Sequence, residues 1–231
     1  MDGQRLEEWY RLNLSGFYEW EDRPHADKWL LFEDNMGPYL SIDETSLSDG
    51  ELYTIVTNKE AKGRKGAIVA MVRGTKAEDV TEVLLRIKDR LRHKVKEVTL
   101  DMAANMGMIV DRCFTKASQV TDRFHVQKLA CDALQDMRIA LRWQAIEQEN
   151  KEMALAKENN ISYVSQVLEN GDTHRQLLVR SRYLLFKNED KWTPRQRQRA
   201  EILFHYYPSL EVAYKLTMQL KNIYHITKEK K

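Results

Sequence analysis

Two aspartates that lie far apart in the chain each follow a short segment in which apolar and polar residues alternate. Asp43 follows the run 40–42, and Asp101 closes the run 98–100. Alternation along a strand places the apolar residues before Asp43 on the opposite face from its carboxylate. Two carboxylates that meet repel each other unless a cation lies between them, and hard Mg²⁺ prefers such oxygen ligands. The pattern predicts a divalent-cation site if the two strands are neighbours.

A pair of such cations, Mg²⁺ or Mn²⁺, about 3.5–4 Å apart can activate an attacking water or 3′-hydroxyl and stabilise the leaving oxygen of a phosphodiester. The competing interpretation is that each aspartate only caps the turn after its strand, and for either residue alone this interpretation is favoured. Asp43 and Asp101 together, in the strand order expected below, favour metal binding.

The elements that must position these residues begin with β-rich segments. A turn around Ser48, Asp49 and Gly50 separates the first two, which indicates a hairpin. Thr75 is the expected N-cap of a helix whose apolar face runs to Leu91. The expected strands are 39–45, 51–57, 66–73, 95–101 and 118–122, and the expected short helix is 105–114.

This succession predicts an α/β fold with a mixed five-stranded sheet in the RNase H-like order, because crossover connections place the later strands parallel to the first. After Phe124 the sequence is almost entirely helical. Thr193 and Pro194 predict a helix start, and Pro208 separates the last two helices. We expect an N-terminal arm over 1–37, a catalytic core over 38–140 and a helical insertion region over 141–231.

Asp122, Arg123, Phe124 and His125 follow the last expected strand and open the long helix. Their spacing alone favours a simple interpretation, in which Asp122 caps the helix and His125 is a surface residue.

The segments 42–47, 100–102 and 122–126 together resemble the DDE transposases of bacterial insertion sequences that carry a D-x-x-H motif after the second catalytic aspartate. The resemblance covers residues 39–140, and the helical remainder fits the insertion that this group places before its final acid. It implies that Asp43 and Asp101 are the first two metal ligands and that Asp122 and His125 brace the site or touch DNA.

The resemblance also implies a third acid, a glutamate on a helix beyond the insertion, and no residue after Phe124 reproduces that setting. Glu201 and Glu211 lie in insertion-like helices, and the chain ends at Lys228-Glu229-Lys230-Lys231. We therefore expect a truncated catalytic domain of a mobile genetic element. Its activity alone is doubtful, because an incomplete ligand set leaves the charge and geometry of a two-metal site incomplete.

The charge distribution is uneven. Residues 1–60 hold 5 Lys and Arg against 14 Asp and Glu, whereas the remainder holds 32 against 21. This asymmetry suits DNA binding by the second part, although solvated helix faces produce the same count. The candidate DNA contacts are Arg123, Lys128, Arg195 and Arg199. We expect Trp143, Trp192 and the aromatic residues 204, 206 and 207 to pack in the core rather than to stack on bases.

No signal peptide or membrane span is visible, so a cytoplasmic protein is expected. Cys113 and Cys131 lack a metal-binding spacing and are expected to be buried free thiols. No DNA-reading motif precedes Asp43, so recognition of element ends would need a separate module, and the complete enzyme is expected to be a homo-oligomer. Two rival hypotheses are a noncatalytic DNA-binding or assembly remnant and a host RNase H-like nuclease.

Overall fold

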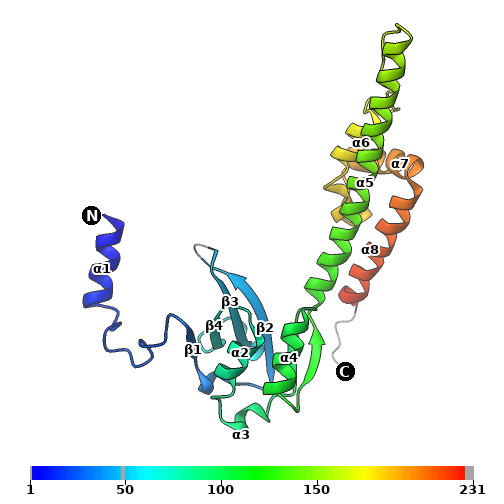
Figure 1. The fold of residues 1–231 in the computed structure, drawn as a ribbon. Helices are drawn as coiled ribbons and strands as arrows, with labels where there is room; N and C mark the ends of the chain where they lie inside the picture. The colour runs from blue at the N-terminus through cyan, green and yellow to red at the C-terminus, as the bar shows by residue number, and fades with distance from the viewer. Residues whose placement is uncertain (1, 48–49, 227–231) are drawn as a thin grey trace. The chain divides into compact units, whose positions relative to one another are not determined.

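The computed structural model describes residues 2–47 and 50–226, and it divides into two compact units, Met1–Asp122 and Arg123–Lys231 (Figure 1). The first unit contains the sheet and the second is helical. Ser48 and Asp49 of the expected turn, and residues 227–231 at the end of the chain, lie outside the described residues.

The sheet has six strands in the order β1-β4-β3-β2-β5-β6. Strands β1 to β4 form antiparallel pairs, whereas β5 runs parallel to β2 and β6 runs parallel to β5. The strands are β1 (Trp29–Leu31), β2 (Tyr39–Ser46), β3 (Leu52–Asn58), β4 (Ile68–Arg73), β5 (Glu97–Leu100) and β6 (Ser118–Thr121). This mixed α/β sheet followed by helices confirms the expected fold class.

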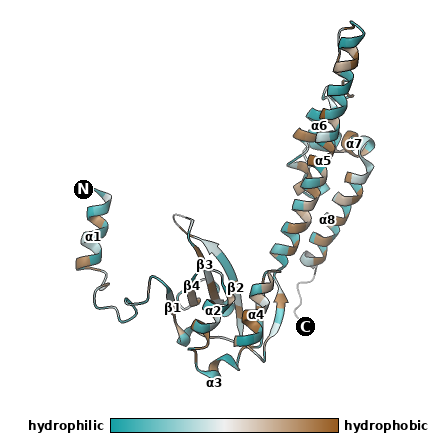
Figure 2. Ribbon diagram, viewed as in Figure 1, coloured by the Kyte–Doolittle hydropathy of each residue, from teal (hydrophilic) through white to brown (hydrophobic). Residues whose placement is uncertain are grey.

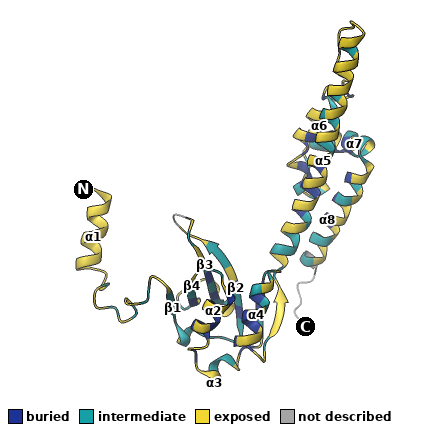
Figure 3. Cartoon of the chain, in the orientation of Figure 1, coloured by how far each residue is buried: buried dark blue, intermediate teal, exposed yellow. Residues whose placement is uncertain are grey.

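The sequence predicted five strands, whereas the sheet has six. The sixth, β1, comes from the segment expected to be an arm, and it pairs with β4 through Leu30 and Met71 at the edge of the sheet. Ahead of it, α1 (Gly3–Asn13) contains no buried residue and is exposed along its length (Figure 3).

Helices cover one face of the sheet. Leu40 and Ile42 of β2 and Val98 of β5 are at most 1% exposed, and they share a core with apolar residues of α2 (Ala77–Leu84) and α4 (Ala104–Cys113). The same alternation therefore leaves Ser41, Asp43 and Thr99 on the other face.

The helix after β4 differs from the prediction at its start and in its length. Lys76 rather than Thr75 is the N-cap of α2, and the chain then forms a separate short helix, α3 (Asp89–Arg92). The backbone carbonyl of Thr75 instead accepts a hydrogen bond of 3.2 Å from Asn105 Nδ2.

The helical unit is built from the helices α5 (Arg123–Glu158), α6 (His174–Arg180), α7 (Pro194–Tyr206) and α8 (Pro208–Ile226). Its core includes Leu134 of α5, Leu177 of α6 and Tyr214 of α8. Hydrophobic and hydrophilic residues alternate along α5 and α8 (Figure 2), as expected for helices that each bury one stripe. Thr193 caps α7 through a capping box with Pro194 at its start, as predicted.

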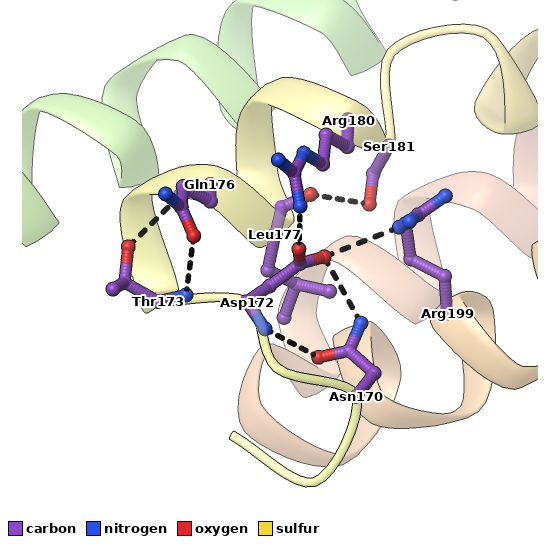
Figure 4. A network of polar contacts seen from close by, with 8 residues as sticks. All are labelled: Asn170, Asp172, Thr173, Gln176, Leu177, Arg180, Ser181 and Arg199. Carbon is purple, nitrogen blue, oxygen red and sulfur yellow. Dashed lines mark hydrogen bonds and ion pairs between the residues drawn. The ribbon is translucent and has the colours of Figure 1, made fainter. Parts of the chain in front are cut away.

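A buried carboxylate ties α6 to α7 (Figure 4). Asp172 is 1% exposed and forms ion pairs with Arg180 and with Arg199, whose Nε lies 3.3 Å from its Oδ2. Asn170 Nδ2 donates a third hydrogen bond of 3.0 Å to the carboxylate. Because each carboxylate oxygen has a donor, the burial of this charge is compensated.

Within the described residues, no helix is both long and apolar enough to cross a membrane. Cys113 and Cys131 are buried free thiols, as predicted. A boundary at residue 140 would fall inside α5, which runs unbroken from Arg123, whereas the two compact units separate between residues 122 and 123. The extent of the catalytic core as a functional domain remains a prediction.

Candidate metal and DNA site

The first site residues lie on neighbouring parallel strands. Ser41 of β2 is paired with Thr99 of β5. Continuing this register by two residues aligns Asp43 with Asp101, on the face opposite the helices. Adjacent strands are about 4.8 Å apart, so the backbones at these two positions are expected to lie within the reach of a shared cation.

Backbone N–H groups orient both carboxylates. Asp43 Oδ1 accepts a hydrogen bond of 2.8 Å from the N–H of Glu44, and Asp101 Oδ1 accepts one of 2.7 Å from the N–H of Ala103. Asp43 is exposed and Asp101 is partly buried. Such bonds limit the rotation of each carboxylate and leave acidic oxygen ligands at the edge where α4 begins, a donor set that suits a hard divalent cation.

A polar contact on the helix-covered face connects the two aspartate-bearing segments. Asn105, in the first turn of α4, donates from Nδ2 to Glu44 Oε1 at 2.9 Å as well as to the carbonyl of Thr75. Since Glu44 follows Asp43 and Asn105 lies shortly after Asp101, this amide holds β2 and the β5–α4 loop together. Sequence reasoning missed Asn105, although its place near Asp101 was a usable signal.

Lys59 was also missed. It follows β3, and its Nζ lies 2.6 Å from Thr99 Oγ1 and 3.4 Å from Glu97 Oε1. Glu97, Thr99 and Asp101 alternate along one face of β5 and its continuation. Lys59 therefore offsets the negative charge of Glu97, which lies on the same face of β5 as Asp101. No signal in the sequence pointed to it, because the contact joins residues that are distant in the chain.

The structure places Asp122 directly after β6, where its N–H donates to the carbonyl of Leu100 at 2.7 Å. Thr121 is paired with Leu100, so the register continues from Asp101 to Asp122. Three aspartates thus lie on neighbouring strands, Asp43 in the second half of β2 and Asp101 and Asp122 directly after β5 and β6. Among the described residues, however, no group of three or more His, Cys, Asp or Glu side chains is arranged to hold a metal ion.

The other members of the predicted motif open α5. The rings of Phe124 and His125 meet edge to face with centroids 5.6 Å apart, and Arg123 and Lys128 are exposed. Arg123 Nη1 donates a hydrogen bond of 3.5 Å to the carbonyl oxygen of Tyr224 in α8. The exposure of Arg123 and Lys128 on the helical unit is compatible with the predicted contact to DNA.

The two residues of α7 that were predicted to contact DNA differ in their exposure and in their partners. Arg195 is exposed, whereas Arg199 directs its guanidinium to the buried Asp172 (Figure 4). Arg199 therefore has a structural partner, which gives it a role that its sequence spacing did not indicate. The aromatic prediction holds for Trp192, which packs against the helical core, but it was wrong for Trp143, which is 57% exposed.

A family model described as a transposase, from the ISL3 group of DDE transposases, matches residues 40–231. No curated protein matches the sequence. The matched region includes the predicted metal ligands and the motif that opens α5, and it covers most of the chain. The mixed sheet and the following helices described above agree with this match. The chain therefore belongs to the ISL3 family of DDE transposases.

Proposed function

We propose that this chain carries the metal-binding half of a transposase active site, in which Asp43 and Asp101 bind Mg²⁺ or Mn²⁺ for cleavage and strand transfer of DNA. The observation that carries the proposal is the parallel register of β2 and β5, in which Ser41 pairs with Thr99. DNA is the partner that membership of a transposase family implies.

The bound cations would supply Lewis-acid stabilisation of the phosphodiester oxygens. The protein's part is to hold two oriented carboxylates, through the N–H groups of Glu44 and Ala103, at one sheet edge. Asn105 holds the β5–α4 loop against β2 by its bond to Glu44. Pre-set ligands reduce the reorganisation that the reaction requires, which is how positioning contributes to catalysis.

The alternative is that the chain binds DNA or assists assembly without cleaving it. The observation that favours this alternative is that no third acidic or histidine side chain joins a metal-binding group among the described residues. Recognition of element ends by a separate module and formation of a homo-oligomer belong to the same proposal, as companions of a catalytic body.

Cleavage of a supercoiled plasmid in Mg²⁺ separates the two functions. We expect D43N and D101N each to lower the nicking rate more than about 100-fold, because mutation of even outer-shell partners of metal ligands costs about 10- to 100-fold. The matched control is D34N, which changes an exposed aspartate of the same unit. Wild-type DNA binding with no nicking would support the alternative, and nicking that survives D43N would exclude this site.

A further inference from the structure

Three arginines of the helical unit, Arg138, Arg142 and Arg182, lie close enough for their positive charges to interact. Arg138 of α5 is only 6% exposed, and its pKa is lowered by burial and by the nearby positive charges of Arg182 and Arg142. Within the described parts of the chain, none of the three forms an ion pair with a carboxylate. Like charges gathered in this way raise the free energy of the folded chain unless an anion offsets them.

Neutral groups hold the buried member of this cluster. Arg138 Nε donates to Gln135 Oε1 at 2.8 Å, and its Nη1 donates to the carbonyl of Leu178 at 3.0 Å. Gln135 in turn donates from Nε2 to the carbonyl of Arg182 at 3.3 Å. These bonds fix the position of the positive charge without neutralising it.

A second observation, an unpaired donor, points to a ligand-binding role. Arg142 Nε is buried and has no hydrogen-bond partner among the described residues. Buried donors are almost always paired, and leaving one unpaired costs about 1–3 kcal/mol. A ligand acceptor would remove this cost if the Arg142 side chain turned to bring Nε to it.

Exposed aromatic rings flank the arginines. The guanidinium of Arg142 lies 5.9 Å from the ring centroid of Trp143, and that of Arg182 lies 5.5 Å from the ring centroid of Tyr183. Trp143 is 57% exposed and Tyr183 is 69% exposed. Large rings left on the surface beside positive charge are the combination that binds phosphates and stacks on bases.

We infer that Arg138, Arg142 and Arg182, with Trp143 and Tyr183, form a binding patch for a DNA strand with unstacked bases, such as a frayed or single-stranded end. Phosphate oxygens would contact Arg142 and Arg182 and so offset the charge of the buried Arg138 beside them. The rings would stack on bases, which a closed duplex does not offer. The inference rests on the proposed function only for its choice of DNA as the ligand. We name these five residues the arginine–aromatic patch.

The test is fluorescence anisotropy of a labelled 25-nucleotide single strand and of the same sequence as a duplex, in EDTA with varied NaCl. We expect R142A/R182A to weaken single-strand binding about 10-fold or more and to reduce the salt slope by about 1.4, since each phosphate contact on a single strand contributes about 0.7. W143A is expected to weaken single-strand binding at least about 5-fold and duplex binding less, because stacking on one base contributes about 1–3 kcal/mol.

The matched control is K151A/K157A, which removes the same charge from exposed positions of α5. We expect it to change single-strand affinity less than about 2-fold. Circular dichroism verifies that all variants are folded. An equal loss in both double variants, or no loss in R142A/R182A, would overturn the inference. A change in sedimentation without a change in DNA affinity would assign the patch to a protein interface and also overturn it.

The experiment distinguishes this inference from the proposed function because it contains no divalent cation. Metal-dependent nicking with unchanged binding by R142A/R182A would leave the function standing and exclude the patch. Loss of single-strand binding by R142A/R182A, together with nicking that is unchanged in D43N, would support the patch and exclude the proposed metal site.

Discussion

Ser41 and Thr99 face each other across the parallel pair of β2 and β5, and two residues beyond each of them stand Asp43 and Asp101. Side chains separated by two residues share a face of the strand, so both aspartates project away from the helix-covered core. The apolar neighbours of each aspartate are buried on the opposite side, and this burial fixes the register. The core of the sheet therefore positions the candidate metal ligands.

Replacing Asn105 with Ala tests whether its amide positions the site. The change removes the hydrogen bonds to Glu44 Oε1 and to the carbonyl of Thr75, so we expect plasmid nicking to fall about 10-fold or more. Asn105→Asp is a stricter variant, because it places a negative charge against Glu44. Nicking at the wild-type rate in both variants would show that this contact does not support the site.

Replacing Gly37 with Ala tests the packing at the start of β2. An added Cβ would lie 2.7 Å from Asn58 Oδ1. Asn58 cannot easily move aside, because its Nδ2 donates to the carbonyl of Asn35 and its Oδ1 accepts from the N–H of Glu60. We expect a loss of about 1–3 kcal/mol in the free energy of unfolding, measured with urea. Gly3→Ala, where no atom lies within 4 Å, is the control and is expected to have little effect.

Replacing Asp172 with Asn tests the ion pairs that join α6 to α7. The change keeps the shape of the side chain but leaves Arg180 and Arg199 without their carboxylate. We expect a loss of about 2–3 kcal/mol, less than the roughly 3–5 kcal/mol of a fully buried pair, because Arg180 is half exposed. The exposed control is Glu201→Gln. Equal urea midpoints for the two variants would contradict a structural role of Asp172.

The two cysteines are expected to react slowly with a disulfide reagent at pH 8. Burial raises the pKa of both thiols, Cys113 and Cys131, so the reactive thiolate is scarce in the folded chain. The folded chain also holds these protons more tightly than the unfolded chain. Stability should therefore be constant below the ordinary thiol pKa of about 8.5 and fall as the pH rises above it. Fast labelling of both thiols before urea is added would refute this prediction.

The sequence was informative where local patterns decide structure. Alternation of apolar residues around Ile42 and Val98 predicted the buried face, and Thr193 with Pro194 predicted the start of α7. The short segment 118–122 before the motif that opens α5 was predicted as the last strand, and β6 occupies Ser118–Thr121. Each of these features depends on residues that are close in the chain.

Long-range contacts escaped prediction. The strand β1 has only three residues, Trp29–Leu31, which is too short for an alternating pattern, and its pairing with β4 supplies the hydrogen bonds that make it a strand. Lys59 reaches Thr99, and Arg199 reaches Asp172, only through the tertiary fold. Trp143 was expected in the core because aromatic residues usually pack there, but its position on α5 directs it outward.

The central claim is that Asp43 and Asp101 bind the same divalent cations, and electron paramagnetic resonance of Mn²⁺ measures this most directly. Titration of the wild-type chain should deplete the signal of free Mn²⁺, and D43N and D101N should each weaken this binding at least about 10-fold, whereas D34N should not. Wild-type binding that persists unchanged in both D43N and D101N, or no binding by the wild-type chain at millimolar Mn²⁺, would contradict the claim.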